Sequence, residues 1–591
     1  MPRAVTIVPE RRSYNQWVAG QTLDGHAHRQ TAVAARHWPV RTVLVTALGS
    51  SASLVCEVIG ATITLFYGVD VSVAAILTGC LLMFVASLPI AVEAARKGLD
   101  IDLITRGAGF GYLGSTITAL IYASFTFLLF AIEASIMAVA VQDVAGIGIE
   151  FACVLCAVAV LPLAWSGMRT VARFQTWSQP VWIVLQLIPL GYIAWRGEPV
   201  IAAWADFTGI YAPRAPVVSF GLALSVLLSL LPRIGEQVEY LRFMPPQSMT
   251  GARRWWTAVV LGGPGWVLIG GAKLLLGSVL AAWAVSSGVA PDGAARPGAM
   301  FGEVLAPLAG SARGGLLMTA ALVVVCQLKV NVTNAHAGAV AWSNVFSRLT
   351  HGYAGRAVWL VFNVGLATTL LFFGIIRSME IVLMFYASLA AGWIGALSAD
   401  LLVSGPLGLR PQATEFQRAY LFDVNPVGIG AMLLSLLASA VCQLGFAGEV
   451  AQAFSPVIGL FVAFAAAPAL AALTKGRYYL ARKRAAGEPA MQTCVICENR
   501  FERGDTAHCP VYSGPICSMC CTLETRCHDV CRQGGRATEQ FTNLAARMLP
   551  QRLARYVHTT TGHFVGVAGA FTLANMLVLG LIGREYARVY P

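Results

Sequence analysis

Charged residues are scarce in this chain: they make up 12% of its 591 residues, whereas hydrophobic residues make up 57%. A soluble domain of this length carries more charge and does not reach the mean hydropathy of +0.68 found here. The first 40 residues lack a long apolar run and a small-residue cleavage site, so we expect no cleavable signal peptide and a cytoplasmic amino terminus. The composition therefore predicts a polytopic membrane protein.

The net charge of +12 does not indicate a nucleic-acid-binding protein. The Lys and Arg residues fall in short segments between apolar runs, where basic residues set the orientation of membrane helices. We therefore expect lipid headgroups, and not nucleic acid, as the neighbours of these charges.

Long apolar runs, each of about 20 residues or more, account for most of the chain. Lys and Arg concentrate in alternate loops between them, which predicts a bundle with both ends on the cytoplasmic side of the membrane. A thirteenth run, residues 564–583, follows a cysteine-rich stretch. The twelve runs before that stretch lie near residues 43–67, 71–95, 115–141, 149–168, 178–195, 216–241, 256–287, 315–346, 357–375, 379–403, 426–446 and 450–473.

Helix-breaking residues interrupt three of these runs. The first run contains Gly49–Ser53, the sixth contains Pro232 and Gly235, and the seventh opens near Gly262. Broken helices in a membrane bundle are typical of a transporter's binding site, because unwound backbone can coordinate a substrate or an ion.

Four ionisable residues fall near the middle of apolar runs: Glu57, Glu133, Lys273 and Lys329. Each would cost about 3 kcal/mol or more if it faced lipid, so we expect them to face the interior and to pair with one another. Two interpretations stay open. The pairs are either static salt bridges that fix helix packing or parts of an ion, proton or substrate path.

Lys329 stands in a row of polar residues within the eighth run. A polar stripe of this length predicts a hydrated cavity rather than a sealed core. The other members of the stripe are Gln327, Asn331, Thr333, Asn334 and His336.

Three segments resemble motifs of the nucleobase cation symporter family, of the purine and cytosine permease type. "KGLDIDLITRGAGFGYLGS" (97–115) resembles the segment that joins helices 2 and 3 of that family. "GEQVEYLRF" (235–243) is similar to its helix 6 ending, and "QLKVNVTNAHAG" (327–338) falls where the family has an Asn-rich helix 8. The order and spacing of these segments agree over residues 40–475.

The resemblance implies an all-α twelve-helix bundle with a five-plus-five inverted repeat, in which helices 1 and 6 are broken. It implies a substrate site that Glu133 and Leu129 on helix 3 form with Asn334 or Asn331 on helix 8, and we add Gln327 of the polar stripe as a further candidate. The family's helix 6 Trp has no counterpart, because residues 216–241 contain no Trp. Without that stacking partner, a planar nucleobase is a less natural substrate.

The resemblance also implies a cation site between the break of helix 1, at Gly49 and Ser50, and hydroxyls of helix 8 such as that of Thr333. Lys329 stands at or beside the hydroxyl position. We therefore expect its ammonium to replace a sodium ion and to hold helix 8 to helix 1 through Glu57. In this interpretation sodium coupling is absent, and Lys273 belongs to the same charged group.

A second module follows the bundle, where eight cysteines crowd into residues 494–531. Two CxxC pairs at this separation are typical of structural zinc sites, and a cytosolic position argues against disulfides. We expect two zinc ions, one held by the first and third ligand pairs and one by His508 or Cys509 with Cys527 and Cys531. An iron–sulfur cluster and a thiol redox sensor stay open as alternatives. The predicted ligands are Cys494, Cys497, His508, Cys509, Cys517, Cys520, Cys527 and Cys531.

These patterns predict a secondary transporter that carries a small nitrogenous solute by alternating access without sodium. The alternative is a transporter-derived receptor that signals through a separate partner such as a histidine kinase, because similar cysteine segments in the family join permease-like domains to sensor kinases. An enzyme is not expected, since the sequence shows no paired nucleophile and base.

The domain boundaries follow from these runs. The predicted segments are a cytosolic amino-terminal segment (1–40), a permease-like transmembrane domain (41–475), a basic linker (476–493), a cysteine-rich metal-binding module (494–531), a second linker (532–561), an extra transmembrane helix (562–584) and a tail (585–591).

Overall fold

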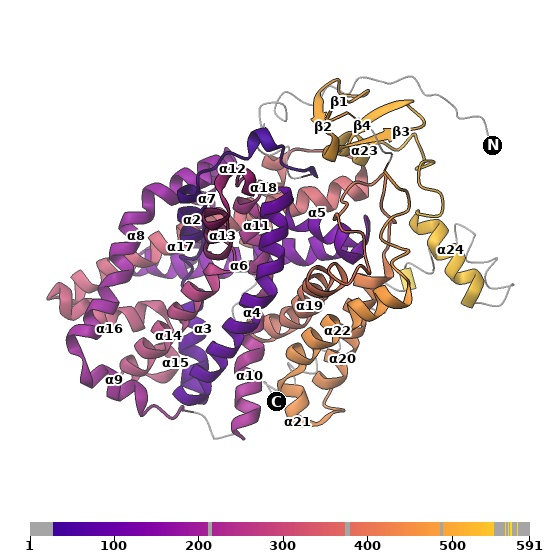
Figure 1. The fold of residues 1–591 in the computed structure, drawn as a ribbon. Coiled ribbons are helices and arrows are strands. Elements are labelled where there is room, and N and C mark those ends of the chain that lie inside the picture. Colours follow the sequence, from indigo (N-terminus) through magenta and orange to yellow (C-terminus); the bar gives the residue numbers. More distant parts are fainter. Residues whose placement is uncertain are drawn as a thin grey trace.

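The computed structural model describes residues 28–210, 215–372, 379–484 and 489–548, together with six single positions between 562 and 576. Helices occupy each of the twelve apolar ranges that the sequence predicts, and a small β-containing module follows them (Figure 1). Most of the predicted thirteenth helix (562–584) lies outside the described residues.

The first apolar run is a broken helix, as predicted. Helix α2 (Val40–Ser50) and helix α3 (Val55–Tyr67) meet at an angle of 44°, and residues 51–54 between them are not helical. The sixth run is interrupted more gently: α10 (Pro216–Leu228) and α11 (Ile234–Leu241) are joined by a 3₁₀ turn, Leu231–Arg233. Both interruptions expose backbone groups that other side chains must satisfy.

The remaining helices complete the bundle. They are α4 (Val69–Lys97), α5 (Ile101–Thr105), α6 (Ser115–Ala145), α7 (Ile149–Trp165), α8 (Met168–Arg196), α9 (Glu198–Ala205), α12 (Gln247–Thr250), α13 (Ala252–Gly262), α14 (Gly265–Ser286), α15 (Pro291–Ala294), α16 (Pro297–Ala309), α17 (Ala312–Thr350), α18 (Arg356–Phe372), α19 (Met379–Ala399), α20 (Pro426–Gln443), α21 (Gly448–Ala453) and α22 (Ser455–Leu473).

Eight helices or joined helices are long and apolar enough to cross a membrane, or up to ten if each of the bent pairs α2–α3 and α7–α8 forms one span. Helix α18 is apolar but shorter. The described part of the chain is therefore a multi-pass membrane protein, and the exact number of twelve spans stays a prediction.

Helix packing brings together the apolar helices that carry the buried charged residues. Helix α6 lies along α17, α3 lies along α14, and α19, α20 and α22 form a group at one side (Figure 1). The contact between α3 and α14 is very close, because a Cβ atom on Gly277 would lie 2.0 Å from the carbonyl oxygen of Glu57. Small residues at such positions allow membrane helices to approach each other.

The cysteine module lies at one end of the bundle, which we call the module face (Figure 1). Strand β1 (Met491–Thr493) pairs with β2 (Arg500–Glu502) in one antiparallel hairpin. Strand β3 (Thr506–Cys509) pairs with β4 (Gly514–Cys517) in another, in a register that sets Thr506 opposite Cys517. The short helix α23 (Ser518–Leu523) follows, and α24 (Ala537–Met548) leads away from the module.

Candidate functional site

The break between α2 and α3 is held by side chains from four other elements. Arg233 donates to the carbonyl oxygen of Ser50 at 2.9 Å, and Lys273 donates to that of Ala52 at 3.0 Å. The Ser53 hydroxyl donates to the carboxylate of Glu133, and the backbone N–H of Leu54 donates to the Gln327 side chain at 3.3 Å. Buried backbone groups need such partners, so this network explains how a helix can be unwound inside the bundle.

Glu57 and Lys273 form the central ion pair. The carboxylate on α3 and the ammonium on α14 lie 2.9 Å apart, and both side chains are buried. Lys273 also lies over the ring of Trp182, 5.8 Å from its centroid. The predicted pairing of charges inside the bundle is therefore confirmed for these two residues.

Glu133 lies on α6 at the level of the helix break. One of its oxygens accepts from Ser53, and the other is buried without a hydrogen-bond partner among the described residues. Leu129 lies one helical turn earlier on α6 and is also buried. Glu133 therefore faces the break with an acceptor oxygen that no described residue uses, and its role as a substrate ligand stays a prediction.

Gln327 on α17 contacts the same region, and Asn331 and Asn334 follow it one and two turns further along that helix. Gln327 accepts from Leu54, but its amide nitrogen has no partner within the described chain. The amide nitrogen of Asn331 and the amide oxygen of Asn334 are likewise buried without partners there. Unsatisfied amide groups in a core each cost about 1–3 kcal/mol, which makes them candidates for binding a solute.

Lys329 does not contact Glu57, so its expected link to the first helix is wrong. Its ammonium instead donates to three groups on α8: the carbonyl oxygen of Gln175 at 3.1 Å, the Ser178 hydroxyl at 2.8 Å and the Gln179 side-chain oxygen at 3.2 Å. The physical reason is geometric. Lys273 on α14 takes Glu57, and α8 offers Lys329 three neutral acceptors, which match the three donors of an ammonium.

Gln175 fills the space between α2 and α17. Its amide nitrogen donates to the carbonyl oxygen of Lys329 at 2.8 Å and to the Thr333 hydroxyl at 3.2 Å. A Cβ atom on Gly49 would lie 2.2 Å from the side-chain oxygen of Gln175, so a larger residue at that position of α2 would have to displace the Gln175 amide. The predicted cation-site residues Gly49 and Thr333 therefore lie close together, with an amide group between them.

The sequence interpretation missed several charged residues of the sixth run. Arg233 lies 3.8 Å from Glu236, and its guanidinium lies over the Trp266 ring, 5.5 Å from the centroid. Glu239 lies on the same short helix, α11, and both glutamates are buried. The signal that could have found them is the row of charges in "LPRIGEQVEYLR" (231–242), which ends an otherwise apolar run.

A four-cysteine cluster forms the candidate metal centre of the module. The sulfur atoms of its members all lie within 4.8 Å of one another, and the grouping unites the first and third predicted ligand pairs. The backbone N–H groups of Cys517 and Cys520 point at sulfur atoms of the cluster, each at 3.4 Å. Four thiolates at this separation suit a tetrahedral metal ion, although the ion's identity stays a prediction. The members are Cys494, Cys497, Cys517 and Cys520.

The second predicted set of ligands is not gathered in the same way. Among the described residues only the four cysteines of that cluster bring their ligand atoms within 4.8 Å of one another. His508 is exposed on β3, whereas Cys509 and Cys527 are buried in the core of the module together with Cys521. Cys531 packs against that core. The second zinc ion therefore stays a prediction.

Arg418 anchors the module to the transmembrane bundle. It lies in the segment between α19 and α20, and it donates to the carbonyl oxygens of Cys521 at 2.9 Å and Glu524 at 2.7 Å. It also pairs with Asp529 at 2.8 Å. The imidazole of His351, which follows α17, lies 3.0 Å from the carbonyl oxygen of Thr522. The module is thus held to the bundle by hydrogen bonds to its own backbone.

The fold is similar to that of solved transporters. A structure of Mhp1, a nucleobase-cation-symport-1 family transporter, in a closed conformation with bromovinylhydantoin bound, has a TM-score of 0.54 and 13% identity over 76% of this chain and 99% of that one. An inward-facing structure of Mhp1 has a TM-score of 0.59 and 14% identity over 80% and 96%. An outward-open, substrate-bound Na⁺-coupled sialic acid symporter has a TM-score of 0.51 and 14% identity over 78% and 96%.

No protein-family model and no curated protein sequence match this chain. At identities of 13–14% the structural likenesses show the fold, which agrees with the resemblance read from the sequence motifs. The link between the cysteine segment and sensor kinases stays a prediction.

Proposed function

We propose that this protein is a secondary transporter that carries a small nitrogenous solute across the bacterial inner membrane by alternating access. The observation that carries the proposal is the set of buried polar atoms, unpartnered among the described residues, that face the break between α2 and α3. The proposal is supported by the solved neighbours, whose structures include closed, inward-facing and outward-open states. The two proteins in these three structures are both transporters, which favours transport over the receptor alternative and over an enzyme.

The site predicts the solute's chemistry. Glu133 and Asn334 offer acceptor oxygens, whereas Gln327 and Asn331 offer donor N–H groups. A solute that alternates N–H donors with carbonyl acceptors, such as a hydantoin, a pyrimidine or a related amide, satisfies both kinds of group. Leu129 stands at the position that the family resemblance assigns to a stacking Trp, so we expect shape and hydrogen bonding to select the solute more than ring stacking.

We further propose that transport does not depend on sodium, in contrast to the sialic acid neighbour, which is Na⁺-coupled. The support is the amide of Gln175, which donates to the Lys329 carbonyl and the Thr333 hydroxyl beside Gly49. Those two oxygens are the kind of ligand that a sodium ion needs. With an amide nitrogen in place and the Lys329 ammonium close by, a cation would have to displace a hydrogen-bonded group.

Uptake into proteoliposomes tests both proposals. A thermal-shift screen of purines, pyrimidines, hydantoins and amino acids first selects a solute that stabilises the purified protein. We expect saturable uptake of that solute at equal rates in sodium and choline buffers, and loss of uptake in Glu133→Gln. Glu150→Gln, at the start of α7, serves as the matched control because Glu150 is exposed. Saturable binding without flux would overturn the transport proposal, and uptake that requires sodium would overturn the second.

We also propose that the amino terminus and the cysteine module are cytoplasmic and that the module holds two structural zinc ions. The four-cysteine cluster supports one ion, and the family resemblance with its Lys and Arg distribution supports the orientation. A structural ion would fix β4 and α23, and α23 carries the carbonyl oxygens of Cys521 and Thr522 to which Arg418 donates.

A further inference from the structure

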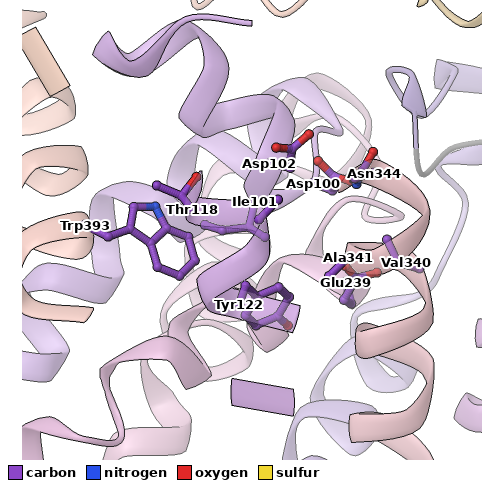
Figure 2. Close-up of a pocket in the computed structure, with 11 residues that line it drawn as sticks. Asp100, Ile101, Asp102, Thr118, Tyr122, Glu239, Val340, Ala341, Asn344 and Trp393 are labelled. Atoms are coloured by element: carbon purple, nitrogen blue, oxygen red, sulfur yellow. The ribbon is translucent and has the colours of Figure 1, made fainter. Parts of the chain in front are cut away.

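A small cavity lies near the module face, between α5, α6, α11, α17 and α19 (Figure 2). It offers about 10 Å³ to the centre of a water molecule, which is room for about one water. Its polar lining includes Asp100, Asp102, Tyr122, Glu239 and Asn344. Three carboxyl groups from two parts of the chain thus meet around one small space.

Asp100 joins three elements at this cavity. It precedes α5 and caps it, because its carboxylate accepts from the Leu103 N–H at 2.7 Å. The amide of Asn344 on α17 donates to the same carboxylate at 3.2 Å. Arg242, at the end of α11, lies 4.0 Å away. Asp100 is buried, so these contacts replace its water.

The negative charge of Asp102 has closer positive partners than that of Asp100. Arg106 and Arg348 each approach its carboxylate to 2.7 Å. Burial alone would raise the pKa of Asp102, but the two guanidiniums outweigh it and hold the pKa below its usual value. Asp102 therefore stays ionised, and as an anion it repels charge on Asp100.

Other groups around Asp100 also influence its pKa. Glu239 on α11 adds a second negative neighbour, although Arg242 pairs with it at 2.8 Å. Burial, together with Asp102 and Glu239 and against the attraction of Arg242, raises the pKa of Asp100 to about 7. His28, near Asn344, adds no charge, because burial and Arg106 lower its pKa to about 3.

Tyr122 provides an independent sign that the cavity holds a ligand. Its side chain lines the cavity from α6, and its hydroxyl is buried with no hydrogen-bond partner in the described part of the chain (Figure 2). A buried hydroxyl is normally satisfied by protein or by water. One water in the cavity would serve Tyr122 and would also bring a proton carrier to Asp100.

We propose that Asp100 binds a proton that this transporter carries and releases at the module face. The assignment rests on the proposed transport function and names its coupling ion. A hydronium ion gives its proton to the Asp100 carboxylate and leaves water, and release is the reverse step. The neutral carboxyl no longer attracts Arg242, so loading loosens the contact between α11 and the Asp100 loop, and release restores it.

A row of carboxyl groups leads from this site toward the proposed solute site. Glu239 and Glu236 are spaced by three residues on α11 and therefore share a face of that helix. Glu236 lies 3.8 Å from Arg233, which donates to the Ser50 carbonyl oxygen at the helix break. His336 on α17 lies 3.9 Å from Glu239. Ionisable groups of α11 therefore extend from the cavity to the helix break.

Infrared titration of the full-length protein in lipid nanodiscs tests the proton site without any solute. We expect a protonated-carboxyl band that titrates near neutral pH in the wild type and is missing in both Asp100→Asn and Asp100→Ser. Asn and Ser both retain the cap on α5, so the two variants should fold. Asp70→Asn, at the start of α4, is the control because Asp70 is exposed. A spectrum that does not change in either Asp100 variant overturns the proposal.

Transport measurements separate this inference from the proposed function. With one proton carried per solute, a gradient of about one pH unit supports about tenfold accumulation. We expect Asp100→Asn to lose gradient-driven accumulation but to keep solute exchange. Accumulation that persists in Asp100→Asn overturns the role of Asp100. A third outcome is that neither the wild type nor Asp100→Asn moves solute, while the titrating carboxyl band is present in the wild type and missing in the variant. That result overturns the transport function but supports the proton-binding site.

Discussion

The Glu57 carboxylate and the Lys273 ammonium lie 2.9 Å apart in the interior of the bundle, and Lys273 also donates to the backbone of the helix break at Ala52. One side chain therefore neutralises a buried acid and satisfies an unwound carbonyl. The packing of α3 on α14 fixes this geometry through the close approach at Gly277. The pair is thus tied to the conformation of the break.

Lys273→Met should destabilise the protein strongly. It leaves Glu57 as an unpaired buried charge, a change that costs about 3–5 kcal/mol. Thermal unfolding in detergent measures the loss. The double variant Glu57→Gln with Lys273→Met removes both charges and should recover much of it. If the double variant is as unstable as the single one, the ion pair is not the source of the effect.

Lys329→Met should destabilise the contact between α8 and α17 without creating a sodium site. The substitution removes three hydrogen bonds and leaves the acceptors of Gln175, Ser178 and Gln179 unsatisfied, at about 1–3 kcal/mol each at most. The unfolding temperature should therefore fall, and added sodium should not restore it. Lys97→Met, at the end of α4, is a milder control because its side chain is 26% exposed. Stabilisation of Lys329→Met by sodium would contradict this account.

The sequence predicted the helix break, the pairing of buried charges inside the bundle and the first cysteine cluster, because local signals carry each of them, but it assigned Glu57 to Lys329 and not to Lys273. Glycine and serine mark the break, a charge in an apolar run demands a partner, and CxxC spacing marks a metal centre. The partner of Lys329 was predicted wrongly, because three neutral groups of α8 carry no such signal. Asp100 was also missed, since its surroundings come from α5, α11 and α17, which only the fold brings together.

Removal of the metal should unfold the cysteine module and leave the bundle folded. Purified protein should contain bound zinc, and Cys494→Ser should lower the zinc content by one ion per chain, measured by mass spectrometry of the metal. Cys442→Ser, on α20, is the matched control because its thiol lies far along the chain from the cluster. A zinc content that is the same in both variants would exclude the four-cysteine site.

Arg418→Gln should release the module from the bundle. The guanidinium binds backbone carbonyls at Cys521 and Glu524 and pairs with Asp529, so its loss costs about 3 kcal/mol at this interface. Hydrogen exchange of residues 491–531 should become faster while the transmembrane helices stay protected. Arg482→Gln, which removes one exposed hydrogen bond to the His508 carbonyl oxygen and a contact with the Tyr420 ring, should change less. Equal exchange in the two variants would show that Arg418 does not anchor the module.

Asp100 should make the stability of the protein depend on pH in a direction opposite to that of an ordinary carboxylate. Burial raises its pKa from 3.8 to about 7 in the folded state. Between these values the folded chain holds a proton that the unfolded chain has lost, so stability is full below about pH 4 and falls as the pH rises through about 7, by at most about 1.4 kcal/mol per unit. The free energy of unfolding of Asp100→Asn should not show this fall with pH. At pH 8 it should exceed that of the wild type. The difference between the two stability curves cancels the contributions of carboxyls that both proteins share. One of these is Asp505, because burial also raises the pKa of Asp505 to about 7. Parallel stability curves would show that Asp100 is ionised in the folded protein.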